Sequence, residues 1–201
     1  ILRELLQGDD VIVDVGASNV AAFMTEMKRF KSAVGEFDWV LVPTVPALKQ
    51  QLDTIATIDW LHGLGLDGRK VRVGFNQYAG DTQDPVQVVY SQVLGYAAAD
   101  GKGKAVYEPH AVVDHNEVYE LAKDAGQVMR ALAGSTTDWK AARGEAKRAG
   151  DVVALERAMS GQITHDLAVT AHENLERVHA MLFGDQRANH ADPAPSGRKR
   201  A

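Results

Sequence analysis

The chain of 201 residues contains no cysteine. That absence excludes disulfides, thiolate nucleophiles and Cys-ligated metals, and it fits a reducing cytoplasm. No apolar run approaches the roughly 18 residues that a membrane-spanning helix needs, and no basic-then-apolar signal peptide opens the sequence. We therefore expect a cytoplasmic protein with no membrane span.

Acidic residues outnumber basic residues in this sequence. The sequence has 22 Lys and Arg residues against 27 Asp and Glu residues, a formal net charge of -5. Because neutralising phosphates requires clustered cations, any contact with DNA must be local, and we expect it to be indirect. The local basic groups are Arg143, Lys147 and Arg148, and then Arg198, Lys199 and Arg200. Groups of charged residues are usually solvated surfaces, but these could also contact DNA or an acidic partner.

Short apolar runs separated by amphipathic segments make up most of the sequence. The apolar runs predict strands at residues 11–15, 39–43, 71–76 and 105–108. Helical spacing of apolar residues predicts helices at residues 19–32, 47–64, 86–94 and 116–133, and a loop is expected at 109–115. This alternation is typical of βαβ units, so we expect an α/β fold, a mostly parallel sheet with helices on both faces.

The composition changes along the chain and predicts three regions. We expect the α/β domain to span residues 1–134. An Ala-, Glu- and Arg-rich stretch predicts a helical extension at residues 135–183, built from two or three helices. Residues 184–201 are polar and include two prolines, which predicts a disordered tail.

Asp14 is the first candidate for a functional residue. It lies near the end of the first predicted strand and is followed by Gly16 and by the N-cap residues Ser18 and Asn19. Ligands of open α/β sheets bind outside the carboxyl ends of the strands. The sequence therefore predicts a phosphate or metal site here, although Asp14 could instead cap the turn that follows.

Three stretches of the sequence resemble successive landmarks of one superfamily, the ParA/MinD superfamily of P-loop ATPases, in order and in spacing. They are Val11-Ile12-Val13-Asp14-Val15-Gly16-Ala17-Ser18, Val40-Leu41-Val42-Pro43-Thr44-Val45-Pro46 and Val73-Gly74-Phe75-Asn76. Within the superfamily, four stretches are similar to plasmid stability proteins of the StbB type: Asp14-Val15-Gly16-Ala17-Ser18-Asn19, Pro43-Thr44-Val45-Pro46, Lys49-Gln50-Gln51 and His115-Asn116-Glu117-Val118. The resemblance covers roughly residues 10–132.

The resemblance implies a function and a set of residue roles. Such proteins bind ATP and Mg²⁺ between the subunits of a homodimer and switch between partners, here a plasmid-encoded protein, in plasmid stability, partition or conjugative transfer. Asp14 would be the catalytic and Mg²⁺-side acid. Gly16 would face the terminal phosphate, Asn76 would read the adenine edge, and Pro109 with His110 would lie in the loop past the base.

One landmark of the superfamily is missing from this sequence. The pattern G-x-x-x-x-G-K-[ST] of the phosphate loop does not occur. The superfamily places that loop upstream of its first strand seen here, so we expect a P-loop NTPase-like fold that is incomplete at the N-terminus. ATPase activity is then expected only if the missing segment is supplied. The alternative is a non-catalytic adaptor that retains the fold and contacts other proteins through its C-terminal helices.

Overall fold

The computed structural model describes residues 11–80 and 84–184. Its strands are β1 (Val40–Thr44), β2 (Val71–Tyr78) and β3 (Val106–Asp114). Its longer helices are α2 (Val20–Arg29), α4 (Leu48–Gly63), α6 (Ser91–Ala98), α9 (Trp139–Ala149) and α10 (Val152–Phe183). Its shorter helical segments are η1 (Ala17–Asn19), α3 (Lys31–Val34), η2 (Gly68–Lys70), α5 (Val86–Val89), α7 (Val118–Asp124) and α8 (Met129–Ala133).

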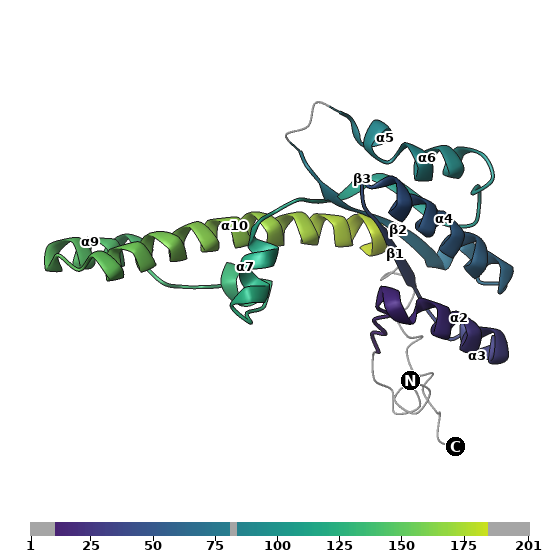
Figure 1. The fold of residues 1–201 in the computed structure, drawn as a ribbon, viewed down its shortest axis with the longest axis horizontal. Coiled ribbons are helices and arrows are strands. Elements are labelled where there is room, and N and C mark those ends of the chain that lie inside the picture. Colours follow the sequence, from purple (N-terminus) through teal and green to yellow (C-terminus); the bar gives the residue numbers. More distant parts are fainter. Residues whose placement is uncertain (1–10, 81–83, 185–201) are drawn as a thin grey trace, which may run out of the picture.

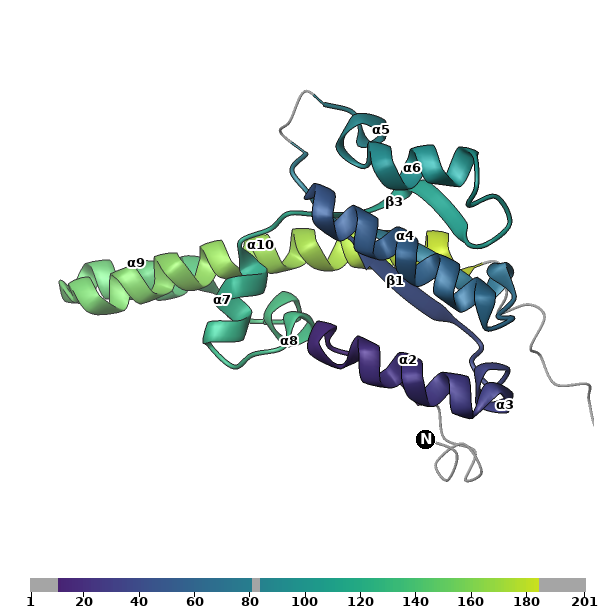
Figure 2. The same cartoon turned by 45° about the vertical axis from the view of Figure 1, so that its right-hand side comes forward.

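The three strands form a parallel sheet in the order β1-β2-β3. Each strand is added on the same side of the previous one, and right-handed crossovers then place both connecting helices on one face. Accordingly α4 and α6 lie over one face of the sheet, while the C-terminal part of α10 packs against β3 on the other (Figures 1 and 2). The predicted α/β class with a parallel sheet and helices on both faces is confirmed.

The main core lies between β2 and the helices α4 and α6. Val71, Val73 and Phe75 point into it and are fully buried, as are Ile58 and Tyr90. The rings of Phe75 and Tyr90 meet edge to face, with their centroids 5.0 Å apart. Burial of each such aliphatic or aromatic side chain stabilises the fold by about 1.5–3 kcal/mol, so the central strand is the best-anchored part of the sheet.

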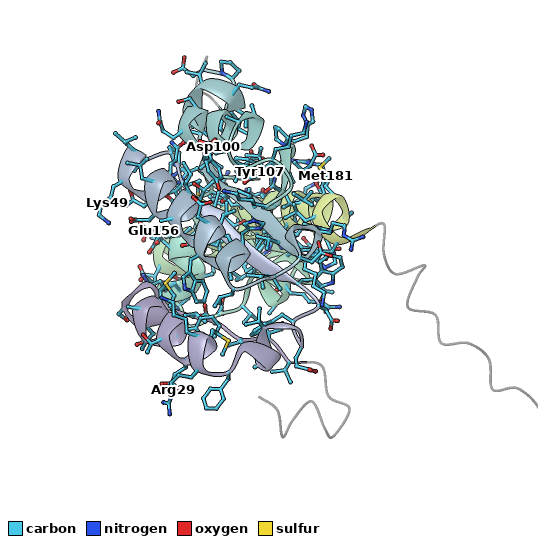
Figure 3. All side chains as sticks on the ribbon, turned by 90° about the vertical axis from the view of Figure 1, so that its right-hand side faces the viewer. Arg29, Lys49, Asp100, Tyr107, Glu156 and Met181 are labelled. Carbon is cyan, nitrogen blue, oxygen red and sulfur yellow. The ribbon has the colours of Figure 1, made fainter. Side chains whose placement is uncertain are left out.

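The outer surfaces of α4 and α2 carry charged side chains. Lys49 and Arg29 point away from their helices (Figure 3) and pair only along them, with Asp53 at 2.7 Å and Glu26 at 3.1 Å. Exposed pairs of this kind contribute little to stability.

The strand predicted at residues 11–15 is wrong. Residues 11–16 have no regular secondary structure and Ile12 is 96% exposed, so the sheet has three described strands in place of the four expected. An apolar run becomes a strand only where a neighbouring strand satisfies its backbone hydrogen bonds. In the described part of the chain no strand pairs with residues 11–15.

Two further local predictions are corrected. The loop expected at 109–115 is largely strand, because β3 continues to Asp114. The single helix expected at 116–133 is two helices, α7 and α8, and the break falls where Gly126 adopts a left-handed φ of 62°. A left-handed residue cannot continue a right-handed helix.

The predicted helical extension has two parts. From Val152 onward α10 first runs antiparallel to α9, and together they form a hairpin that projects from the sheet (Figure 1). Its C-terminal part then lies against the sheet, where Val178 and Leu182 pack on Ala111. The tail predicted at 184–201 lies outside the described residues, apart from Gly184.

The end of α10 is held by a buried arginine of β2. Arg72 is 7% exposed, its Nε donates to the carbonyl of Leu182 at 2.8 Å, and its guanidinium lies 4.5 Å from the ring of Trp39. Burial lowers the pKa of Arg72. Because the carbonyls at a helix C-terminus carry partial negative charge, this contact stabilises both the cation and the helix end.

The carboxyl edge of the sheet as a candidate functional site

The carboxyl ends of the three parallel strands meet at one edge of the sheet. β1 ends at Thr44, β2 ends at Asn76-Gln77-Tyr78, and β3 ends at Asp114, whose register partner is Tyr78. The amide of His115 donates to the carbonyl of Tyr78 at 2.8 Å, which joins the last two strands just beyond their paired residues. This edge is where an open α/β sheet binds ligands.

The residue after Asn76 has an unusual backbone conformation. The side-chain Oδ1 of Asn76 accepts a hydrogen bond of 2.9 Å from the amide of Gln77, and Gln77 has a φ of 62°. It is the one described residue other than glycine with a positive φ. Such a conformation costs about 1–3 kcal/mol and clusters at functional sites. The Nδ2 group of Asn76 has no hydrogen-bond partner among the described residues and can donate to a ligand.

Tyr90 stabilises this strained turn by a hydrogen bond from the core. Its hydroxyl is the donor in a hydrogen bond of 2.7 Å to the carbonyl of Asn76, and its side chain is fully buried. Burial, and then the proximity of Tyr78 and Asp114, raise the pKa of Tyr90. The hydroxyl therefore stays protonated and keeps donating throughout the physiological range.

Asp114 connects the edge to α10. The side-chain amide of Asn174, which is 5% exposed, donates to the carboxylate of Asp114 at 2.9 Å and to the carbonyl of Val112 at 3.0 Å. Its Oδ1 accepts from the backbone amide of Asp114 at 3.1 Å. The guanidinium of Arg177 lies 3.8 Å from the same carboxylate. The carboxyl end of β3 is thus fixed to α10 by charged and amide groups.

Thr44 is a buried polar group without a described partner. Its side chain is 1% exposed, and Oγ1 forms no hydrogen bond within residues 11–80 and 84–184. A buried hydroxyl without a partner is costly. It adds a second unusual polar group at the end of a strand.

The structure brings only one of the expected site residues to this edge. Asn76 is there. Asp14 and Gly16 lie on the exposed irregular segment before η1, so no strand pairing places them at the carboxyl edge. Pro109 lies inside β3 where the register with β2 shifts, five residues before Asp114, and the neighbouring amide of His110 donates to the Glu108 carboxylate at 3.1 Å.

The expected ATP and Mg²⁺ fit this arrangement only in part. The free amide donor of Asn76 suits the edge of an adenine, which both donates and accepts hydrogen bonds. The phosphate and metal side does not assemble: Asp14 is exposed outside the sheet, and the described residues contain no group of three His, Asp or Glu side chains placed to hold a metal ion. No catalytic step through the magnesium follows from these positions.

Sequence reasoning missed two features of the edge. The left-handed backbone of Gln77 carries no signal in the sequence, because glutamine rarely adopts it. Asn174 is separated by 60 residues from Asp114, and only the packing of α10 on β3 brings them together. Helical spacing in the sequence can indicate that Asn174 faces inward, but it does not indicate which residue Asn174 contacts.

Within the described residues, no helix combines the length and the apolar character that crossing a bilayer requires. Comparison of the chain with protein-family models, with curated proteins and with solved structures found no match.

Proposed function

We propose that the chain is part of an ATP-dependent molecular switch of the ParA/MinD type that acts in plasmid stability, partition or conjugative transfer. The observation that carries the proposal is the carboxyl end of β2, where the free amide donor of Asn76 adjoins the left-handed Gln77. The motif resemblance and the parallel sheet support the same assignment. The chain would contribute the base side of the nucleotide site, and the phosphate side would come from a segment with the missing loop.

Binding of ATP tests the proposed base contact. We expect the protein, together with a segment that carries the phosphate loop, to bind MgATP more tightly than MgGTP, and Asn76→Ala to reduce that preference by roughly tenfold, the worth of one good hydrogen bond. Asn19→Ala is the matched control, because Asn19 is an exposed N-cap whose side chain makes no cap hydrogen bond. An unchanged ATP preference in Asn76→Ala, with the protein still folded, would remove Asn76 from the site.

Nucleotide-dependent dimerisation tests the role of Asp14. Asp14 is not at a metal site in the described residues. If the phosphate-loop segment brings it to the water shell of Mg²⁺, Asp14→Ala should abolish dimerisation by MgATP in analytical ultracentrifugation, and Asp100→Ala should preserve it. Asp100 is exposed and forms no ion pair among the described residues. Dimerisation and turnover that are equal in Asp14→Ala and wild type would contradict the assignment.

A second candidate function is supported by the α9–α10 hairpin. The protein would be a non-catalytic adaptor whose sheet serves as a scaffold and whose hairpin contacts a partner. The projection of the hairpin away from the sheet (Figure 1) favours this function, as does the position of Asp14 outside the sheet. Partner binding that is the same with and without MgATP, in a protein that binds no nucleotide, supports the adaptor and excludes the switch.

A further inference from the structure

The outer face of α9 is basic. One face of this helix packs on α10: Ala146 is buried there, and the ring of Trp139 lies against Gly161. At about 100° per residue, four cations occupy the arc of α9 that points away from α10 or borders it. They are Lys140, Arg143, Lys147 and Arg148.

These cations have no carboxylate partner. Within the described residues none of the four takes part in an ion pair, and the one recorded bond is local, from Nε of Arg148 to the carbonyl of Gly144 at 3.1 Å. The single acid of the helix, Glu145, lies two residues from Arg143 and from Lys147, a spacing at which side chains do not face one another, but three residues from Arg148, a spacing at which they do. Helix α9 therefore carries four cations against one acid, on a protein whose net charge is -5.

Two exposed valines adjoin this basic face at the turn of the hairpin. Gly150 ends α9 in a left-handed conformation with φ 67°, and the amide of Asp151 donates back to the carbonyl of Ala146 at 3.0 Å. Val152 and Val153 then begin α10 and are 64% and 57% exposed. Lys147 and Arg148, in the last turn of α9, thus lie near the two valines, with Asp151 between them. Lys140 and Arg143 lie farther back along α9.

We propose that this tip surface, formed by the four cations along α9 together with Val152 and Val153 at the turn, docks an acidic, amphipathic segment of a partner protein. Carboxylates complement the unpaired cations, and apolar side chains bury the valines. A nucleic-acid backbone would satisfy the cations but offers nothing apolar to cover Val152. The tip also carries no exposed aromatic side chain on which bases could stack. The inference does not depend on nucleotide binding.

The probe for this site is a synthetic helical peptide of Glu and Leu, labelled with a fluorophore and about 30 Å long, which corresponds to about 20 residues. We expect the full chain to bind it in fluorescence anisotropy, and the affinity to fall as salt shortens the range of the charges. The same peptide with Gln in place of Glu should bind weakly, and so should a Glu and Ser peptide that lacks the apolar side. A short DNA duplex should bind more weakly than the Glu and Leu peptide.

Paired variants separate the tip from the rest of the surface. Lys140→Gln with Lys147→Gln should weaken peptide binding by roughly tenfold, since exposed charge pairs contribute up to about 1 kcal/mol each. The control is Lys28→Gln with Lys102→Gln, which makes the same change in net charge at two exposed lysines of other elements. Val152→Ser should weaken binding, whereas Val88→Ser, at a valine of α5 that is also more than half exposed, should leave it unchanged.

Three results would overturn the proposal. One is peptide binding that is equal in both lysine pairs. Another is tighter binding of the DNA duplex than of the peptide, lost in the tip variants, which would make the tip a nucleic-acid site. The third is no binding of the peptide at low salt by a folded chain. The switch proposal is affected by none of these, because MgATP binding is measured separately.

Discussion

At the scale of single residues, buried amides join segments that lie far apart in the sequence. Gln51 of α4 is 3% exposed, and all of its hydrogen-bonding partners are backbone groups. Its Nε2 donates to the carbonyls of Pro46 at 2.7 Å and Val89 at 3.0 Å, and its Oε1 accepts from the amides of Gln92 and Val93 at 3.2 and 3.4 Å. One side chain thus fixes the turn after β1 to the region of α5 and α6.

Gln51→Leu is therefore expected to destabilise the fold strongly. The substitution puts an apolar side chain of similar size in place of the amide and leaves several buried backbone groups without partners, which should lower the free energy of unfolding by about 2–4 kcal/mol. Chemical denaturation followed by circular dichroism measures this. Gln50→Leu is the matched control, because the neighbouring Gln50 is exposed, and its effect should stay within about 0.5 kcal/mol. Equal effects of the two substitutions would refute the role of Gln51.

A second prediction at this scale concerns pH. The Asp59 carboxylate accepts hydrogen bonds from Nζ of Lys104 at 2.5 Å and from the hydroxyl of Tyr96 at 2.6 Å. The bond from Lys104, and then that from Tyr96, lower the pKa of Asp59 below its usual 3.8. A carboxylate whose pKa is lower in the folded state stabilises the protein above its unfolded pKa, and that stability is lost as the pH falls through the folded value.

The difference in unfolding free energy between wild type and Asp59→Asn should accordingly depend on pH. At pH 7 we expect a loss of up to about 1 kcal/mol, because the carboxylate is 46% exposed and solvent screens the pair. Near pH 3 the difference should shrink. Asp100→Asn, at an exposed position, should show no such trend. A difference that is constant between pH 7 and pH 3 would show that the carboxylate charge is not what stabilises this contact.

At the scale of elements, the hairpin depends on close packing between its two helices. A Cβ atom built on Gly161 of α10 would come within 2.5 Å of the Trp139 ring, whereas one built on Gly144 of α9 would meet nothing within 4 Å. Both glycines lie inside helices. The same substitution should thus have opposite effects at the two positions.

Gly161→Ala is expected to destabilise the hairpin by about 1–3 kcal/mol, because the rigid indole ring must move. Gly144→Ala should stabilise it by up to about 1 kcal/mol, the difference in helix propensity between glycine and alanine. Thermal unfolding by circular dichroism, with Trp fluorescence as a second signal, compares them. Destabilisation by both alanines would show that the packing in this region differs from that described.

At the scale of the whole molecule, α10 links the projecting hairpin to the carboxyl edge of the sheet. The link consists of Asn174 and Arg177 at Asp114, followed by Arg72 at the helix end. The two surfaces for which functions are proposed therefore share one continuous helix.

Asn174→Ala should loosen this link. We expect it to lower the free energy of unfolding by about 1–3 kcal/mol, because the carbonyl of Val112 and the amide of Asp114 each lose a buried partner. Hydrogen exchange should accelerate at Val112 to Asp114 and in the part of α10 facing β3. Glu173→Ala, at the exposed neighbouring position, should change neither quantity. Unchanged exchange in Asn174→Ala would show that the link is held by apolar packing alone.

Local patterns in the sequence determined much of the fold. Strands β1 and β2 and helix α4 form where apolar periodicity predicts them, since strand and helix periods are read directly from neighbouring residues. The same patterns determined the α/β class and the helical character of the C-terminal region. They failed at residues 11–15, where a strand-like run has no neighbouring strand to pair with in the described part of the chain.

Only the tertiary structure decided which polar groups meet. It placed Asn76 at the carboxyl edge and Asp14 outside the sheet, and it joined Asn174 to Asp114 across 60 residues. It also placed the cations of α9 along a hairpin that projects from the sheet. The physical reason is that these contacts depend on how distant elements pack, whereas the sequence records directly only what neighbouring residues favour.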